Sequence, residues 1–247
     1  MDPAYYVAAG SLKARSIQLD GLANNLANVS TVGFKAERTF FSVFNKAKAD
    51  GGQLPLTPHV NDGTVLANRG TDFSQGPLRQ TANAFDLAVE GDGFFAIRTP
   101  GGDRLTRDGR FTLAKDGQVV THSGEPLLGK NGQPIQIDPA QGEVKISPDG
   151  SVYQGGTVIS QVDIRNVQNP QMMAREAGNR FNPAGTTAAP FQGRVSQGYL
   201  EQSGVDMASA MVEMIRLNRL FEMSMKVAST LSNDLDTRSI NDIANNR

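Results

Sequence analysis

The first thirty residues carry an apolar side chain at every seventh position. The repeated positions are Tyr5, Leu12, Leu19 and Leu26, with Ala8, Leu22 and Val29 at the companion positions of the heptad. Only Arg15 interrupts this seam. A pattern sustained over nearly four heptads predicts a long helix over residues 4–29 with one face packed against another helix.

The C-terminal region repeats apolar positions in steps of four and three from Met207. The stripe consists of Met211, Met214, Asn218, Phe221, Met225, Ala228, Ser232 and Leu235, and beside it lie Leu217, Leu220, Val227 and Leu231. Two adjacent stripes predict a long helix that contacts more than one neighbour, and its methionines suit adaptable packing. The alternative is a simple two-helix hairpin beside the central region.

The centre of the chain, from residue 84 to about 165, has short apolar runs separated by turn dipeptides. These dipeptides are Asp92-Gly93, Asp108-Gly109, Asp116-Gly117, Asn131-Gly132 and Asp149-Gly150. Each suits a turn that needs a positive φ. We expect hairpins at "FDLAV-EGDG-FFAIR" and "RFTLA-KDG-QVVTH", and further strands in "PIQID", "EVKIS" and "TVISQVDIRNV". The pattern predicts an antiparallel β region.

These patterns define the expected fold class and organisation. We predict an α+β chain in which an antiparallel β-rich central domain is flanked by long N- and C-terminal helices that pair as a coiled-coil-like bundle. The expected segments are an N-terminal helix (1–35), an extended linker (36–83), a β-rich domain (84–197) and a C-terminal helix (198–247). Residues 45–80 and 168–197 are rich in Gly, Pro, Asn and Gln, which is typical of extended connectors.

Three asparagines near the end of the first predicted helix need an explanation, because Asn is a poor helix former. Asn24 and Asn28 lie four residues apart on one helix face, and Asn25 lies beside them. An amide at a packed seam fixes register and partner at some cost in stability. We expect that role here and for Asn218. A frayed helix end before Gly33 would explain Asn28 but not the other two.

Net charge, cysteine content and the length of apolar runs limit the classes of function that the chain can have. The chain has 247 residues with 24 basic and 25 acidic side chains, a formal net charge of -1, which favours neither nucleic acid nor an anionic membrane as partner. It contains no cysteine, which excludes disulfides, a thiol nucleophile and a Cys-based zinc site. No apolar run approaches the length of a membrane span, and the first residues do not form a Sec-type signal peptide.

We do not expect catalysis, a cofactor or a metal site. The two histidines, His59 and His122, lack a cysteine or paired-carboxylate setting, and Asp92 in the Asp86/Glu90/Asp92 group belongs to a turn. The sequence "EGDGFF" is a turn and not a phosphate-binding loop.

Three motifs carry a family resemblance. "LANNLANVSTVGFKAER" resembles the N-terminal signature of bacterial flagellar rod and hook proteins. "FDLAVEGDGFFAI", followed by "LTRDGRFTLAKDGQVVTHSGEPLLG", resembles the start of their β domain. "GYLEQSGVDMASAMVEMIRLNRLFEMSMKVAST" resembles their C-terminal helix. The motifs occur in the family's order and span most of the chain.

The resemblance implies a structural subunit of the basal-body rod, the axial drive shaft that transmits torque. In such subunits the terminal helices form an inner tube and the β domain an outer layer. Export would use the flagellar type III apparatus without a cleaved signal peptide and place the chain in the periplasmic rod. The partners would be other proximal and distal rod subunits in a helical hetero-assembly.

The opening "MDPAYYVAAG" and the short segment after the first helix resemble proximal-rod members more than distal-rod or hook-type members. A different class, an extracellular β-rich adhesin or a tail-tube-like protein, shares the β-rich centre but does not require helices at both ends. We expect the assembly contacts at Leu12, Leu19, Asn24, Asn25, Leu26, Asn28, Met211, Met214, Asn218, Phe221 and Met225.

Overall fold

The computed structural model describes residues 3–44 and 64–245, and the side chains of residues 9–40 and 69–230. The chain divides into two compact units, each described by itself below. Unit 1 comprises Met1–Ala27, Glu37–Gly70 and Met207–Arg247, and unit 2 comprises Asn28–Ala36 and Thr71–Asp206. Residues 45–63 of the predicted connector 45–80, with His59, lie outside the described residues. The predicted seam side chains outside the described ones are Tyr5, Ala8, Leu231, Ser232 and Leu235.

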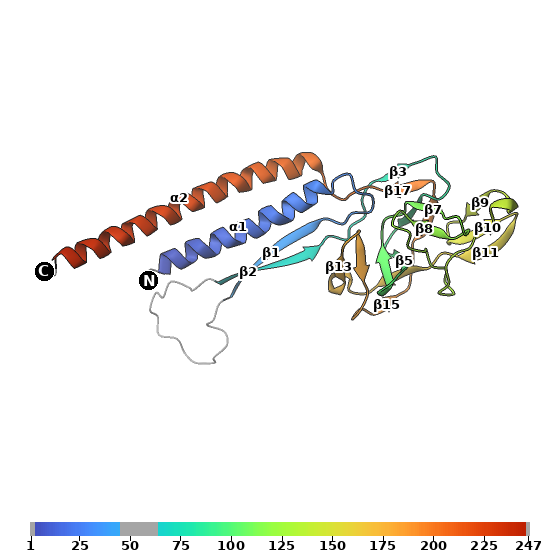
Figure 1. The fold of residues 1–247 in the computed structure, drawn as a ribbon, viewed down its shortest axis with the longest axis horizontal. Coiled ribbons are helices and arrows are strands. Elements are labelled where there is room, and N and C mark those ends of the chain that lie inside the picture. Colours follow the sequence, from blue (N-terminus) through green and yellow to red (C-terminus); the bar gives the residue numbers. More distant parts are fainter. Residues whose placement is uncertain (1–2, 45–63, 246–247) are drawn as a thin grey trace. The chain divides into compact units, whose positions relative to one another are not determined.

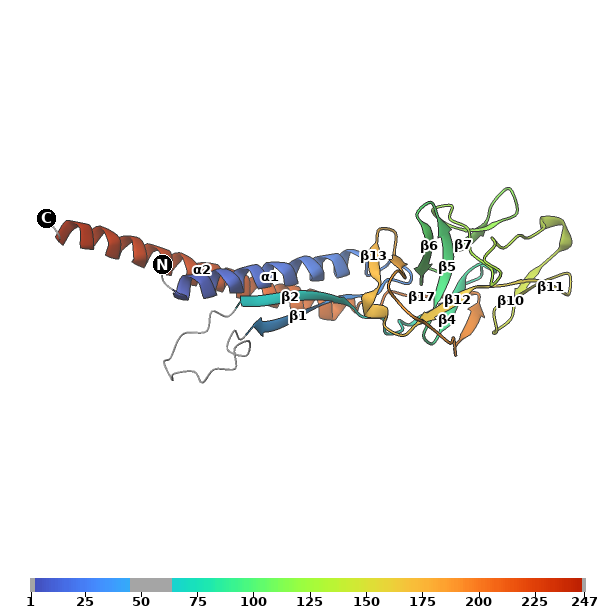
Figure 2. The same ribbon diagram turned by 90° about the horizontal axis from the view of Figure 1, so that it is seen from below.

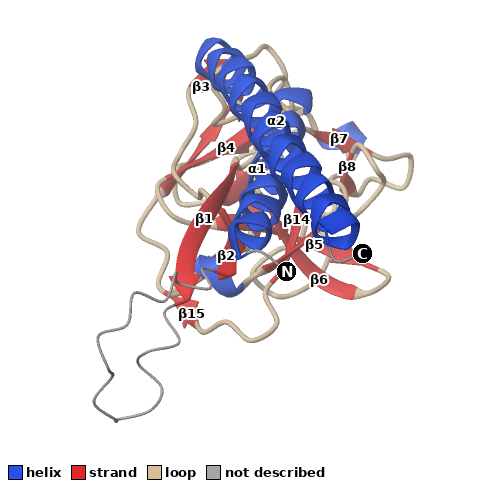
Figure 3. Ribbon diagram, turned by 90° about the vertical axis from the view of Figure 1, so that its left-hand side faces the viewer, coloured by secondary structure: helices blue, strands red, loops and turns tan. Residues whose placement is uncertain are grey.

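Unit 1 contains two helices and a two-stranded sheet. Helix α1 (Pro3–Ala27) and helix α2 (Met207–Asn245) confirm the two predicted helical segments. Strands β1 (Glu37–Phe44) and β2 (Thr64–Thr71) pair with each other within the segment expected to be a linker. The helices lie side by side, and β1 runs along α1 (Figures 1 and 2). Figure 3 shows the same four elements from the end of the helices.

The predicted coiled-coil-like bundle of long terminal helices is wrong. The described part of the chain has only two α-helices, with 25 residues in α1 and 39 in α2, and the strand β1 packs on α1 as a third element. In α2 the predicted seam residues Met211 and Met225 are 48% and 50% exposed, and Asn218 is exposed as well. A seam that leaves its large side chains in solvent does not join two helices.

The covered face of α2 is displaced from the predicted stripe. Ala210 and Leu217 are buried and Ser224 is half-buried, each one residue before a predicted seam position. Met214 and Phe221, which belong to the predicted stripe, are half-buried on the same face. Small side chains such as those of Ala and Ser permit a close approach by a neighbouring element, and the large methionines are left outside.

Unit 2 is built from short antiparallel strands (Figure 1). Its largest sheet has the order β13-β14-β6-β5-β12-β15, formed by Ala174–Glu176, Arg180–Asn182, Gly102–Thr106, Phe94–Thr99, Ile164–Val167 and Ala188–Ala189. A three-stranded sheet has the order β11-β10-β9, from Thr157–Gln161, Ser151–Gln154 and Val144–Ile146.

Three strand pairs complete unit 2. They are β16 (Arg194–Gln197) with β4 (Leu87–Glu90), β17 (Tyr199–Glu201) with β3 (Leu78–Gln80), and β7 (Phe111–Leu113) with β8 (Val119–Thr121). Short 3₁₀ helices cover Pro139–Gln141 and Pro170–Met172.

Of the two predicted hairpins, one is confirmed and one is wrong. The hairpin β7–β8 forms as expected, with Phe111 opposite Thr121. "FDLAV" and "FFAIR" do not pair with each other, since β4 pairs with β16 and β5 with β6 and β12. The turn after Glu90 therefore sends the chain from one sheet to another. The segment "PIQID" contributes single bridges and no named strand.

Four of the five turn dipeptides have the predicted positive φ at their glycine, and at Gly93 the value is 157°. Gly117, Gly132 and Gly150 have φ values of 82°, 74° and 83°. Gly109 does not have a positive φ. Glycine is required there for space, because a Cβ atom would lie 1.6 Å from the carbonyl oxygen of Leu87.

The core of unit 2 has two apolar clusters. The larger is centred on Phe95, Phe111 and Ile97, which are at most 1% exposed. The smaller contains Phe94, Leu105 and Phe181 among others. The Phe95 and Phe111 rings meet edge to face with centroids 5.3 Å apart. Successive buried residues of β5 alternate between the two clusters, with Phe95 and Ile97 in the larger and Phe94 and Ala96 in the smaller, so that one cluster lies on each face of this strand.

Candidate functional site

The segment that continues from α1 is held in unit 2 by its backbone. The Gly33 N–H donates to the Glu201 carbonyl at 2.7 Å, and the Gly204 N–H donates to the Phe34 carbonyl at 3.1 Å. The Asn179 amide donates to the Val32 carbonyl, and the Arg175 guanidinium donates to the Lys35 carbonyl. Residues 32–35 are buried. The segment is thus an integral, buried part of unit 2 and not a loose linker.

Gly33 is the position in this segment that only glycine fits. Its φ of +65° lies in the left-handed region. A Cβ atom would lie 2.3 Å from the carbonyl carbon and oxygen of Arg107, both of which are backbone atoms. The close approach brings the segment directly against the stretch that carries Arg107.

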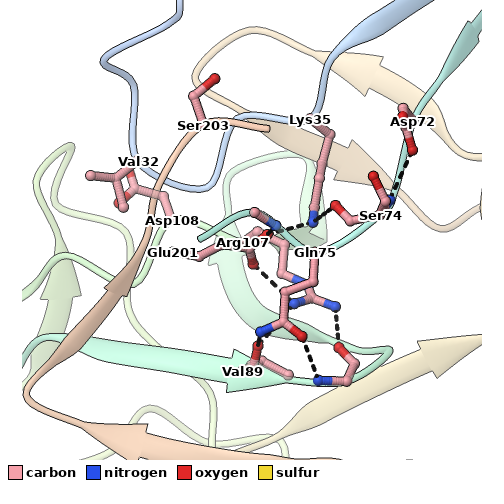
Figure 4. A network of polar contacts seen from close by, with 12 residues as sticks. Val32, Lys35, Asp72, Ser74, Gln75, Val89, Arg107, Asp108, Glu201 and Ser203 are labelled. Carbon is pink, nitrogen blue, oxygen red and sulfur yellow. Dashed lines mark hydrogen bonds and ion pairs between the residues drawn. The ribbon is translucent and has the colours of Figure 1, made fainter. Parts of the chain in front are cut away.

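Beside Gly33 lies a buried cluster of three charged side chains, here called the ion triad: Lys35, Arg107 and Glu201 (Figure 4). Lys35 Nζ lies 2.6 Å from Glu201 Oε1, and Arg107 Nη1 lies 3.0 Å from Glu201 Oε2. All three side chains are at most 2% exposed. Glu201 Oε1 also accepts the Gly76 N–H at 2.8 Å. One carboxylate therefore joins three separate stretches of the chain.

Backbone carbonyls satisfy the remaining cationic charge of the ion triad. Lys35 Nζ donates to the Ser74 carbonyl at 2.8 Å, and Arg107 donates to the carbonyls of Val89 and Gly91. Burial lowers the pKa of Lys35 below its ordinary value of 10.5, and the neighbouring Glu201 carboxylate opposes this shift. Burial likewise lowers the pKa of Arg107. The Glu201 carboxylate thus opposes the effect of burial on the pKa of both cations.

Aromatic rings surround the ion triad. The Arg107 guanidinium lies 5.2 Å from the centroid of Phe94, and Arg175 lies 4.3 Å from that of Phe34. Phe73, Phe94 and Phe181 meet edge to face, with centroids between 5.2 and 5.8 Å apart. Apolar walls of this kind exclude water and strengthen the ion pairs, and they make an unpaired charge costly.

Three family models match the chain. Residues 6–35 match the model described as flagella basal body rod protein, residues 88–154 the D1 domain of flagellar hook protein FlgE/F/G, and residues 196–241 the C-terminal region of flagellar basal body rod FlgEFG proteins. The flagellar basal-body rod proteins FlgF of Rhizobium meliloti and Caulobacter vibrioides are each 35% identical to the chain, over 90% and 92% of both lengths. FlgG of Buchnera aphidicola is 31% identical over 93% of this chain. The chain belongs to the flagellar basal-body rod protein family.

The ion triad takes one residue from each of the three matched regions of this rod protein. Lys35 is the last residue of the N-terminal match, Arg107 lies in the D1 match, and Glu201 lies in the C-terminal match. The triad therefore ties together, inside unit 2, the stretch that follows α1 and the stretch that precedes α2. No proton-transfer chemistry follows from this arrangement, because the carboxylate is saturated by donors and shielded from water.

Asn25 has a specific task within unit 1. It is 7% exposed, and its side-chain amide donates to the Glu37 carbonyl at 2.8 Å and accepts the Glu37 N–H at 2.7 Å. The amide thus acts as the hydrogen-bond partner of a backbone unit at the start of β1. Neither Glu nor Lys offers both a donor and an acceptor in this geometry.

We expect Asn25→Ala to reduce the free energy of unfolding of unit 1 by about 2 kcal/mol, because both backbone groups of Glu37 lose their partner. Asn24→Ala is the matched control, since Asn24 directly precedes Asn25 in the helix and its side chain is exposed. Its expected cost is below about 0.5 kcal/mol. Urea denaturation followed by helical circular dichroism measures both. Equal effects of the two substitutions would contradict this role for Asn25.

The other predicted assembly residues lie in unit 1 or at its end. Half-buried positions are Leu12, Leu19, Leu26, Met214 and Phe221, and exposed positions are Asn24, Met211, Asn218 and Met225. Asn28 accepts a hydrogen bond from the Thr31 hydroxyl at 3.2 Å in the turn after α1. Some of the predicted positions on α1 and α2 are therefore covered and others are not. Of the exposed positions, Asn24 lies on α1, and Met211, Asn218 and Met225 lie on α2.

Sequence reasoning missed the ion triad and Gly33. Lys35, Arg107 and Glu201 each stand as a single charge within a short apolar or turn-rich stretch, and no local spacing connects them. One feature could have indicated them. Arg107 and Glu201 lie at or next to strands whose neighbouring residues are buried, and a charged side chain in such a place needs a partner of opposite charge.

Other candidate chemistry is limited in the described residues. His122 is exposed after β8, and Asp86 accepts a hydrogen bond from Asn83. Glu90 pairs with Arg194, whose hydrogen bond lowers the pKa of this carboxyl. Within residues 3–44 and 64–245, no group of three or more His, Asp or Glu side chains could hold a metal ion, and neither helix is long and apolar enough to span a membrane.

Proposed function

We propose that this rod protein is an F-type subunit of the proximal rod, joined to its neighbours through the outer face of α2. The family establishes a structural subunit of the flagellar basal-body rod that assembles with other basal-body components. The F type is favoured over the G type because the FlgF relatives are 33–35% identical and the FlgG relatives 28–32% identical. The family matches favour this reading over an adhesin or a tail-tube protein.

The observation that carries the proposal is the exposed apolar side of α2. Among the described side chains of this helix, residues 207–230, seven large apolar ones are between 48% and 67% exposed: Met207, Met211, Val212, Ile215, Met223, Met225 and Val227. Isolated apolar residues on a surface are ordinary, but a row along one helix is typical of an interaction surface. Methionine suits contacts with several different partners because its side chain is unbranched and adaptable.

The proposed partners are other proximal and distal rod subunits, in a helical hetero-assembly. We further propose export through the flagellar type III apparatus and a position in the periplasmic part of the basal body. Repetition of one heterologous contact around an axis produces a helical assembly. Within each subunit, the ion triad would keep unit 2 intact while the rod carries torque.

The test replaces Met211 and Met225 together by Ser in a flagellated bacterium that encodes this chain. We expect loss of swimming and basal bodies that lack a complete rod, while the purified variant unfolds within about 0.5 kcal/mol of the parent chain because both positions are exposed. Met172→Ser is the matched control, since Met172 is 62% exposed in unit 2. Normal swimming by the double variant, in a strain that requires the chain for motility, would contradict the proposed role of this face.

A further inference from the structure

Methionine provides the exposed sulfur atoms of this protein. The chain contains eight methionines and no cysteine. A peroxide oxidises thiols and thioethers, and since the chain has no thiol, its thioethers are the sulfur groups that can react. Exposure then decides which of them do. Within residues 9–40 and 69–230, Met173 is 7% exposed and Met214 is half-buried. The five others are 48–62% exposed: Met172, Met207, Met211, Met223 and Met225.

Three of the exposed methionines form one line along α2, here called the thioether line: Met207, Met211 and Met225. They are 48%, 48% and 50% exposed. With 3.6 residues per turn, the three positions lie within about 40° of one another around the helix axis. Met223, by the same geometry, lies more than about 100° away from them. The line is therefore a single strip of apolar, oxidisable side chains on the outer face of this helix.

Oxidation would reverse the property that suits this strip to docking. The thioether is apolar and its side chain is unbranched, so that it packs against varied apolar partners. The sulfoxide is polar, with an oxygen that accepts hydrogen bonds. An acceptor that is buried against an apolar partner without a donor costs free energy. A sulfoxide at a position that stays in water, such as Met172, carries no such cost.

We propose that Met207, Met211 and Met225 are oxidation sites that control entry of the subunit into the rod: a peroxide converts their thioethers to sulfoxides, and the oxidised subunit is not incorporated. In each conversion a lone pair of Sδ attacks one oxygen of hydrogen peroxide, and an S–O bond forms as the O–O bond breaks. The sulfur is oxidised by two electrons. The peroxide is reduced, and the proton of the transferred oxygen leaves with the other oxygen as water.

The modification acts on subunits before they assemble. This inference rests on the proposed function, because it requires that the outer face of α2 is covered in the rod. A docked neighbour then shields the thioether line, so that assembled subunits escape oxidation. The change is reversible, since methionine sulfoxide reductases return both sulfoxide epimers to the thioether. A rod under construction therefore stops growing in the presence of peroxide, whereas a finished rod is unaffected.

Competition within one cell tests the proposal, because two chains then meet the same oxidant and the same partner proteins. One tagged chain is the parent, and the other carries Met207→Leu, Met211→Leu and Met225→Leu, which stay apolar and lack sulfur. Hydrogen peroxide is present during rod assembly, at a dose that oxidises Met172 of the parent chain. We expect the ratio of Leu chain to parent chain in basal bodies to rise about tenfold, because one unpaired buried acceptor costs about that factor in affinity.

Met172→Leu is the matched control in the same competition. Met172 is 62% exposed in unit 2, outside the thioether line. The ratio of this chain to the parent chain in basal bodies should be the same with and without peroxide.

A sulfoxide mimic tests the proposal without an oxidant. The double variant Met211→Gln, Met225→Gln keeps uncharged, unbranched side chains of similar length and adds a carbonyl acceptor to each. In competition with the parent chain in untreated cells, it should be at least about tenfold under-represented in basal bodies. Equal incorporation would overturn the proposal, even if the Leu chain failed to assemble.

Two results in the peroxide experiment would also overturn the proposal. One is an unchanged ratio of Leu chain to parent chain while mass spectrometry finds sulfoxide at Met211 and Met225 of the unassembled parent chain. The other is the absence of sulfoxide at these two positions at the dose that oxidises Met172. In both cases the parent chain would still occur in basal bodies, and the proposed function would stand. Absence of the parent chain from basal bodies of untreated cells would instead contradict the proposed function.

Discussion

Glu201→Gln is expected to reduce the free energy of unfolding of unit 2 by about 3–5 kcal/mol, a large part of the stability of an ordinary domain. The substitution preserves the shape of the side chain and removes its charge. Lys35 and Arg107 would then remain buried, at most 2% exposed, without a carboxylate. Hydrogen exchange of the buried β5 and β6 amides measures the change.

Glu143→Gln is the matched control for this substitution. The Glu143–Lys145 pair is 3.8 Å long and its two side chains are 76% and 73% exposed. Its loss should cost less than about 1 kcal/mol because solvent screens the pair. If Glu201→Gln were as mild as this control, the ion triad would not be the link that we assign to it.

Gly33→Ala is expected to lower the free energy of unfolding of unit 2 by about 3 kcal/mol or more. An L-residue in the left-handed region costs about 1–2 kcal/mol, and the new Cβ atom would in addition press against the backbone of Arg107. Backbone atoms cannot move aside as a flexible side chain can. Urea denaturation of the purified chain measures the loss of free energy. Limited proteolysis of the native chain, read as cleavage in the segment after residue 28, reports the same loss separately.

Gly132→Ala separates the two contributions. Gly132 has a φ of +74°, and a Cβ atom at this position would meet nothing within 4 Å. This variant should therefore show only the conformational cost of about 1–2 kcal/mol. Equal losses at Gly33 and Gly132 would mean that the close approach at Arg107 contributes nothing.

The predictable parts of the fold are those that depend on local periodicity. Both helices and the β7–β8 hairpin follow from apolar spacing and turn residues, since these signals act within a few positions. The pairing of β4 was not predictable in this way. Val89 pairs with Val195, and no local pattern tells a strand which distant strand it will meet.

The face of α2 was misjudged for a different reason. Hydrophobicity alone favours Met211 and Met225 as covered positions, whereas the covered face uses Ala210 and Ser224. Close packing against a neighbouring element favours small side chains, whereas a hydrophobic pattern ranks positions by the apolar character of the side chain alone. The same limit applies to Asn25, whose hydrogen bonds to Glu37 depend on where β1 lies.

The ion triad also determines when unit 2 can be completed during synthesis. Lys35 is separated from Glu201 by 166 positions, and Arg107 is separated from it by 94. A nascent chain therefore carries two cations destined for burial long before their shared carboxylate has been made. Loops of this length close late, so the native interior is unavailable to any N-terminal fragment that stops short of residue 201. Until Glu201 has been made, the ion triad cannot form, and Lys35 and Arg107 lack the carboxylate that pairs with them in the folded unit.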